Sequence, residues 1–244
     1  MSEDRPTAAV FRPDDERLAR AIESLESLGV NPIADPMLAV EPTGNLPRTD
    51  ADAVVFTSKT GAELVAGEWT PGDATVCAIG EPTADALRAN GIAVDVVPET
   101  YSSSGLVETL GERVDGSRVE VARSDHGSDV LLDGLESAGA YVHETVLYRL
   151  VRPEESGESV ELAAEGGLDA ALFTSSLTVD HFVSIAAERD QQEAVRDGLA
   201  DAVVGAIGEP TRETASDHGI DVDVVPETAD FESLAAAVVD RLDR

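Results

Sequence analysis

Short apolar runs alternate with longer stretches in which apolar residues recur at helical spacing. Residues 7–11 form the first run, and the leucine and isoleucine side chains of residues 18–28 then share one face of a predicted helix that ends at Gly29. Similar pairs of a strand and a helix are predicted in residues 52–67, 75–99, 117–142, 169–188 and 201–227, with a last amphipathic helix at 231–242. This alternation predicts an α/β fold in which parallel sheets are covered by helices on both faces.

Two motifs occur twice along the chain. "AIGEPT" stands at 78–83 and at 206–211, and an ungapped comparison of 78–100 with 206–228 gives 15 identical positions of 23. "DAVVFTS" at 52–58 resembles "DAALFTS" at 169–175. The offsets are 128 and 117, so the second copy has 11 extra residues between its motifs. We interpret the repeats as a duplication that gives two flavodoxin-like parallel-sheet domains.

Two stretches interrupt the alternation of strands and helices. Residues 31–49 and 144–159 combine proline or acidic residues with an extended apolar run. One strand-helix unit precedes the first break, and a last set of units follows the second. This order predicts a discontinuous domain 1 (1–39 and 152–244), an inserted domain 2 (40–151), and a two-stranded β-ladder that joins them.

The repeated turns are the candidate binding sites. They follow the carboxyl ends of predicted parallel strands, where helix N-termini present unpaired backbone N–H groups. Gly80 and Gly208 permit a tight turn, and Thr83 and Thr211 add hydroxyl groups near these N–H groups. Serines at the other two turns do the same: Ser58, Ser175 and Ser176. Such turns can bind carboxylates or phosphates, although each one alone is equally compatible with an ordinary helix cap.

No other pattern in the chain indicates a known catalytic or metal site. The sequence has no GxGxxG, GxxxxGK[ST] or GxSxG motif, and its four histidines lack a metal-like spacing. The single cysteine, Cys77, lies in a predicted strand and excludes a disulfide framework. We therefore expect no metal and no disulfide, as is typical of a reduced cytoplasm.

The net charge of −32 disfavours nucleic acid and anionic membranes as partners. The chain has 17 basic and 49 acidic residues, and Lys59 is its only lysine. Such a surface repels nucleic acid and anionic membranes at ordinary ionic strength, and no apolar run approaches the roughly 18 residues of a membrane-spanning helix. The N-terminus, "MSEDRP", lacks the pattern of a secretion signal. We interpret the charge as adaptation to a cytoplasm with molar salt.

Six segments resemble the uroporphyrinogen-III synthase family and come in the family's order over nearly the whole chain. They are "FRP" after the first strand, "VVFTSKTGAE", "AIGEPTADALRANGI", "SDVLLDGLESAGAYVHETVLYRL", "ALFTSSLTVDHF", and "AIGEPTRETASDHGI" followed by "PETADFESLAAAV". The chain departs from many members at 124–129, where "SDHGSD" replaces a more basic turn.

The resemblance implies two α/β domains joined by a two-stranded ladder, with the substrate cleft between them. The family closes the linear tetrapyrrole hydroxymethylbilane to uroporphyrinogen III, with loss of water and inversion of the last pyrrole ring, in haem, sirohaem and cobalamin biosynthesis. It uses no metal or organic cofactor. The expected partner is thus a small polycarboxylate, and nothing in the sequence requires more than a monomer.

The resemblance also implies roles for individual residues. Tyr148 matches the family's tyrosine that faces the cleft, and it would assist departure of the substrate hydroxyl as a weak general acid or orient a ring; the alternative is a structural tyrosine. The implied substrate-binding residues are Arg12, Ser58, Lys59, Gly80, Thr83, Arg123, Ser175, Ser176, Gly208 and Thr211.

A non-enzymatic module with two lobes, which closes on an anionic small molecule, is the competing interpretation. Such a binder would not need the pair of crossing stretches or Tyr148 within the second one. No DNA-binding or receiver domain is apparent beside the repeats. Both features favour the enzyme.

Overall fold

The computed structural model of the chain describes residues 5–13 and 16–242. The chain divides into two compact units. The first unit is Met1–Ala39 with Val151–Arg244, and the second unit is Val40–Leu150. The chain passes from one unit to the other within β3 (Ala39–Pro42) and at the end of β7 (Tyr141–Val151), two strands that are hydrogen-bonded neighbours.

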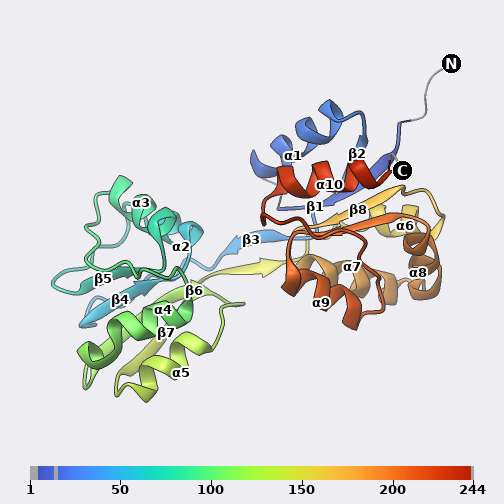
Figure 1. The fold of residues 1–244 in the computed structure, drawn as a ribbon. Helices are drawn as coiled ribbons and strands as arrows, with labels where there is room; N and C mark the ends of the chain where they lie inside the picture. Colours follow the sequence, from blue (N-terminus) through green and yellow to red (C-terminus); the bar gives the residue numbers. More distant parts are fainter. Residues whose placement is uncertain (1–4, 14–15, 243–244) are drawn as a thin grey trace. The chain divides into compact units, whose positions relative to one another are not determined.

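The first unit is built on a four-stranded parallel sheet. Its strand order is β2 (Asn31–Ala34), β1 (Thr7–Phe11), β8 (Ala170–Phe173) and β9 (Val203–Ala206). One face packs on α1 (Glu16–Ser27) and α10 (Phe231–Leu242). The other face packs on α6 (Glu158–Ala164), α7 (Ser176–Glu188), α8 (Gln192–Ala200) and α9 (Glu209–Asp217), so that helices cover both faces (Figure 1).

The second unit is built on a five-stranded sheet. Its order is β3, β7, β6 (Arg118–Ser124), β4 (Ala53–Phe56) and β5 (Thr75–Ala78), and β4 to β7 are parallel. One face packs on α2 (Lys59–Leu64) and α3 (Glu81–Ala89). The other packs on α4 (Ser103–Leu110), the 3₁₀ turn η1 (Gly111–Val114) and α5 (Val130–Ser137) (Figure 1).

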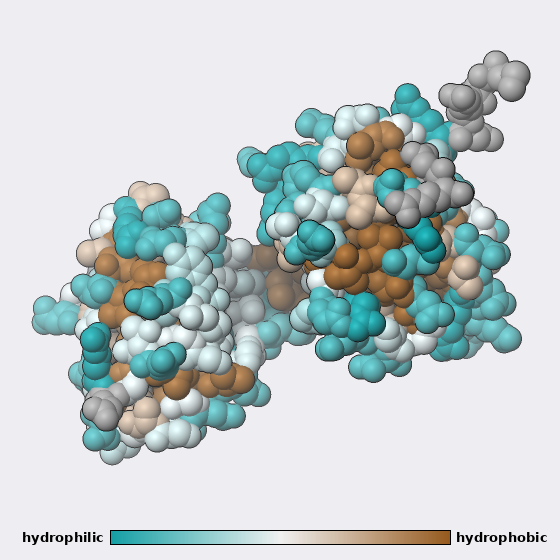
Figure 2. Space-filling model, in the orientation of Figure 1, coloured by the Kyte–Doolittle hydropathy of each residue, from teal (hydrophilic) through white to brown (hydrophobic). Residues whose placement is uncertain are grey.

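The strands are apolar on both sides because both of their faces are covered. Every residue of β4 and β8 is buried, as expected for central strands of a parallel sheet. Phe11, Phe173 and Phe182 form a ring cluster in the first unit, with centroids 4.5 to 5.5 Å apart. Hydrophilic residues spread over the visible surface of each unit (Figure 2). None of the helices in the described part of the chain is long and apolar enough to cross a membrane.

The prediction of a mixed α/β fold with parallel sheets is confirmed, but two local predictions are wrong. Each copy of the long repeat contains one "VDVV" segment, for which we expected a strand. Each segment makes only an isolated bridge: Val96 pairs with Cys77, and Val224 pairs with Gly205. The reason is that a side chain replaces the next ladder bond: Asp95 accepts from the Val76 amide at 2.8 Å, and Asp223 accepts from the Val204 amide at 2.9 Å.

The first break in the pattern contains a strand that we did not assign from the sequence. Residues 31–34 form β2 at the edge of the first sheet. An edge position tolerates proline because one side of the strand needs no N–H donor. In addition, α1 ends at Ser27, so Leu28 lies outside the helix and is exposed.

Candidate functional site

Two hydroxyl groups meet at the carboxyl edge of the sheet in the second unit. Ser58 follows β4 and is the N-cap of α2, where its Oγ accepts a hydrogen bond from the Gly61 amide at 2.9 Å. The Tyr148 hydroxyl, on β7, donates to the same Oγ at 3.1 Å. Gly61 allows this arrangement because a Cβ there would lie 3.1 Å from both Leu147 Cδ1 and Ser58 Oγ.

The hydrogen bonds of Ser58 leave its own proton available. A serine hydroxyl has two acceptor lone pairs and one O–H donor, and here both lone pairs are occupied. No acceptor among the described residues takes the Ser58 proton. Tyr148 is only 6% exposed and packs in the core of this unit, so it polarises Ser58 from the core side. The pair can therefore donate a hydrogen bond to a group bound at this edge.

The N-terminus of α3 lies at the same edge, after β5. Its N-cap is Gly80, which has no side-chain cap, and Pro82 lies in the first turn as predicted. Thr83 is only 3% exposed, and its hydroxyl makes no hydrogen bond to the part of the chain that the structure describes. Uncapped N–H groups and the helix dipole favour an anion here.

The corresponding turns of the first unit have the same backbone plan and different hydroxyl partners. Ser175 caps α7 in a capping box with Thr178. Ser176 donates to the Pro210 carbonyl at 3.1 Å and accepts from the Thr214 hydroxyl at 2.8 Å. Because Ser176 already donates its proton within the unit, it lacks the available donor of Ser58. No tyrosine lies in this unit, since all three tyrosines fall within Val40–Leu150.

The N-terminus of α9 repeats that of α3. Gly208 is its N-cap without a side-chain cap, Pro210 lies in the first turn, and Thr211 is 4% exposed. The hydroxyl of Thr211 also makes no hydrogen bond within the described residues. Glu209 pairs with Arg212, and this hydrogen bond lowers the pKa of the Glu209 carboxyl from its ordinary value. The carboxylate in the first turn is thereby neutralised locally, and the N–H groups remain the dominant positive feature.

The three basic residues of the predicted site have different surroundings. The Arg12 guanidinium lies 5.1 Å from the ring centroid of Phe231, after β1. Lys59 is exposed and pairs with Glu63 at 3.4 Å. Arg123 is buried, donates to Glu144 at 2.6 Å and to the Ser128 carbonyl at 2.7 Å, and pairs with Asp129 at 3.3 Å.

The position of Arg123 gives it a structural task. Gly127 lies against its side chain, where a Cβ would be 2.6 Å from Arg123 Cδ. The guanidinium thus holds together the 124–129 turn. Lys59, which is exposed, is better placed than Arg123 to meet a ligand.

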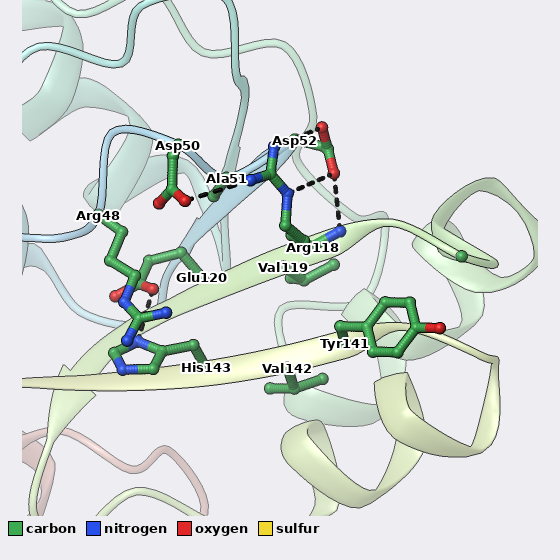
Figure 3. A pocket seen from close by; sticks show the side chains of 11 residues that line it. Arg48, Asp50, Ala51, Asp52, Arg118, Val119, Glu120, Tyr141, Val142 and His143 are labelled. Atoms are coloured by element: carbon green, nitrogen blue, oxygen red, sulfur yellow. Dashed lines mark hydrogen bonds and ion pairs between the residues drawn. The ribbon is translucent and has the colours of Figure 1, made fainter.

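A cavity of the second unit lies at the opposite, amino-terminal edge of its sheet. It has a volume of about 510 Å³ and contains none of the predicted site residues (Figure 3). Arg118 pairs there with Asp50 and Asp52, and its backbone hydrogen bond lowers the pKa of the Asp52 carboxyl. The buried Glu120 accepts from Thr145 and pairs with His143. The charges of this cavity are thus largely satisfied internally.

One exposed aromatic residue at the carboxyl edge was not among the predicted site residues. Tyr101 directly precedes Ser102, the N-cap of α4, and lies on Gly80. The signal in the sequence is the end of the long repeat: "VVPET" is followed by Tyr101 in one copy and by Ala229 in the other.

Comparisons with known proteins show the family of the chain. A sequence model described as uroporphyrinogen-III synthase HemD matches residues 18–236. The chain belongs to the uroporphyrinogen-III synthase family. A putative uroporphyrinogen-III synthase of Methanothermobacter thermautotrophicus is 35% identical over 94% of this chain and 96% of its own. The uroporphyrinogen-III synthase of Chlorobaculum parvum is 23% identical over 97% and 99%.

Solved structures of the family share the fold. A mutant uroporphyrinogen III synthase of Thermus thermophilus superposes with a TM-score of 0.67 at 19% identity, over 98% of both chains. The synthetase of Helicobacter pylori gives a TM-score of 0.65 at 15% identity, over 97% of this chain and 99% of its own. The resemblance drawn from the six sequence segments is therefore confirmed at the level of the family and of the α/β fold.

Proposed function

We propose that this protein converts hydroxymethylbilane to uroporphyrinogen III, with loss of water and inversion of the last pyrrole ring. Membership of the family sets the reaction class, and one observation supports our assignment of the chemistry. The Tyr148–Ser58 pair is a hydroxyl donor at the carboxyl edge of a parallel sheet, where ligands of such sheets bind. The protein is thus a cyclising lyase of tetrapyrrole biosynthesis.

The donor acts on the group that leaves. The terminal carbon–oxygen bond of the bilane breaks, and the hydroxyl departs as water with an added proton, which leaves an azafulvene cation. Ser58, polarised by Tyr148, donates a hydrogen bond to the departing oxygen and so stabilises its developing charge. We assign Ser58 as the contacting group and the buried Tyr148 as the group that positions and polarises it, which the Tyr148–Ser58 hydrogen bond supports.

Ring closure then depends on how the chain of pyrroles is held. The substituted carbon of the last ring attacks the cation to give a spiro intermediate, which fragments and closes again with that ring inverted. The proton consumed in forming water is recovered when the last ring regains its aromaticity. Holding the rings in this orientation lets the inverted closure outrun the spontaneous one.

Helix N-termini are the proposed partners of the eight substrate carboxylates. The first turns of α3 and α9 combine a glycine N-cap with a largely buried threonine whose hydroxyl makes no hydrogen bond within the described residues. We assign Gly80, Thr83, Gly208 and Thr211 to carboxylate contact, with Arg12, Lys59 and the N-cap serines as further candidates. Ser175 is an N-cap serine like Ser58, and Ser176 follows in rank because its hydroxyl already donates to the Pro210 carbonyl. Arg123 supports the 124–129 turn in this proposal.

We also propose that the two units are copies of one flavodoxin-like plan, with the second permuted. The order β2-β1-β8-β9 follows the 2-1-3-4 arrangement of flavodoxin-like sheets, and β7-β6-β4-β5 follows it when β6 is taken as the first strand. In support, the repeated turns follow the third and fourth positions in both sheets. The predicted domains, 1–39 with 152–244 and 40–151, remain part of this proposal.

The charge is the basis for a proposed working environment. A chain of −32 must admit a substrate with eight carboxylates. The Debye length falls from about 8 Å at 0.15 M salt to about 3 Å at 1 M, so that molar salt removes most of the repulsion. We propose a cytoplasmic, monomeric enzyme adapted to such salt.

An isomer assay tests the function. Purified protein is incubated with freshly made hydroxymethylbilane, the product is oxidised, and the porphyrin isomers are separated. We expect the type III isomer in excess over the type I isomer that forms spontaneously. Type I alone, at the rate seen without protein, would disprove the proposal.

A further inference from the structure

The Tyr101 side chain lies against the start of α3 in the second unit. A Cβ on Gly80 would be 2.9 Å from Tyr101 Cγ and 3.0 Å from Cδ2, so only glycine lets the ring approach this closely. The tyrosine is nevertheless 57% exposed. Its hydroxyl makes no hydrogen bond to the described residues. The base of the ring therefore contacts the N-cap, and much of the side chain remains in solvent.

The turn that carries Tyr101 is tightly packed. The Ser102 amide donates to the Thr100 carbonyl at 2.8 Å, and Ser102 Oγ accepts from the Gly105 amide at 3.0 Å. A Cβ on Gly105 would lie 2.0 Å from the Thr100 carbonyl oxygen, so α4 can pack on this turn only through glycine. The ring is thus held in place before any ligand arrives.

The other copy of the repeat lacks this ring. Ala229 follows "VVPET" there, and the nearest atom to a Cβ on Gly208 is Pro210 Cδ at 3.9 Å. Because the two copies share the glycine, the proline and the buried threonine, an anion-binding helix start does not require the tyrosine. The exposed ring adds an aromatic surface to one of two otherwise similar sites.

From this contrast we infer that Tyr101 contacts a pyrrole ring of the substrate and orients it, while the carboxylate arms of that ring reach the N-terminus of α3. The inference rests on the proposed function. Tyr101 would then be a specificity-determining residue, because its ring distinguishes a pyrrole ring of the substrate from a simple carboxylate. The second unit would prefer a carboxylate that is attached to a ring, and the first unit would not.

Kinetics and binding of Tyr101→Ala test the inference, with two control variants. Aromatic contacts of this kind change an equilibrium about two- to tenfold. We expect Tyr101→Ala to raise KM about fivefold with kcat little changed, to lower the ratio of type III to type I product, and to weaken binding of uroporphyrin III about fivefold. Tyr101→Phe should retain wild-type values, because the hydroxyl has no partner to lose.

Tyr141→Ala is the matched control. Tyr141 is 71% exposed and begins β7, at the opposite edge of the same sheet, so its loss should leave all three measurements unchanged. Thermal melts followed by circular dichroism show that each variant folds. A folded Tyr101→Ala protein with wild-type KM, isomer ratio and porphyrin affinity would overturn the inference. The porphyrin titration needs no turnover, so it tests Tyr101 even if wild-type protein forms no type III product.

Discussion

The two repeated units differ most where their backbones agree best. Both place a serine N-cap after "FT" and a glycine N-cap before "EPT". In the second unit Ser58 accepts from Tyr148, whereas in the first unit its counterpart Ser175 has no tyrosine partner and the neighbouring Ser176 donates to the Pro210 carbonyl. Duplication thus preserved the geometry of the turns, and substitutions at neighbouring strands and helices changed the hydrogen-bond partners of their serines.

The largest expected effect is a difference in kcat between the Ser58 and Ser176 variants. Ser58→Ala removes the donor to the departing hydroxyl, and we expect kcat to fall about 100-fold, the lower range for loss of a positioned acid–base group. Ser176→Ala should change kcat less than about threefold, because its hydroxyl bonds only within the first unit. Single-turnover kinetics with isomer analysis provide the measurement.

Loss of the α2 cap is a second consequence of Ser58→Ala, with a cost of about 1 kcal/mol in stability. Ser58→Thr keeps both the cap and the hydroxyl and should restore most of the rate. Tyr148→Phe should slow turnover about tenfold without unfolding, since the ring still fills its place in the core. Equal rates for wild type, Ser58→Ala and Tyr148→Phe would remove the pair from the mechanism.

The difference between the serines shows how far sequence reasoning reaches. The motifs "FTS" and "GEPT" placed helix starts at Ser58 and Gly80, because local cap and turn chemistry determines where a helix begins. The partners of these residues come from distant positions: Tyr148 is 90 residues from Ser58. No local pattern determines that pairing, and the resemblance alone suggested a role for Tyr148.

Tyr101 and the "VDVV" segments also show that contacts between distant residues cannot be read from a local pattern. Tyr101 differs from Ala229 in the sequence, but its importance depends on contact with Gly80, 21 positions away. The "VDVV" segments have the apolar pattern of strands, and the aspartate within each one bonds to a neighbouring amide and stops the ladder after one bridge. Burial patterns were thus reliable, and side-chain hydrogen bonds that replace backbone ones were not foreseeable.

Salt should affect the two units unequally, and this is the second largest expected effect. Residues 40–150 contain 19 acidic and 7 basic residues, a net charge of −12, which leaves −20 of the total −32 for the first unit. We expect kcat/KM to rise about tenfold from 0.15 M to 1 M KCl as repulsion of the substrate is screened.

Limited proteolysis at both salt concentrations locates the effect. The first unit carries the greater self-repulsion, so its peptide bonds should be cleaved earlier at 0.15 M and become protected at 1 M. Highest turnover in dilute buffer, with both units resistant to protease, would contradict the proposed adaptation to salt.

The smallest effect concerns one matched position in the two sheets. Cys77 on β5 and Gly205 on β9 form the equivalent bridges to Val96 and Val224. A Cβ on Gly205 would lie 2.6 Å from Val238 Cγ2 and 2.9 Å from Leu234 Cδ1, so α10 packs directly on the β9 backbone. Gly205→Ala should therefore destabilise the first unit by about 1–3 kcal/mol, the usual cost of overpacking a core. Cys77→Ala at the matched position causes no overpacking, because that position already accommodates a larger side chain.

The single thiol reports which unit opens. Burial, with a smaller contribution from Asp95, raises the pKa of the Cys77 thiol to about 12, so a thiol reagent at neutral pH should react only after the second unit unfolds. In Gly205→Ala, circular dichroism should show an earlier melting transition, while Cys77 labelling keeps its wild-type midpoint if the units unfold independently. Labelling that shifts together with the melt would show one cooperative transition. An unchanged melting transition would mean that α10 moves away from β9 at little cost. The close packing of α10 on β9 would then contribute little to the free energy of unfolding of the first unit.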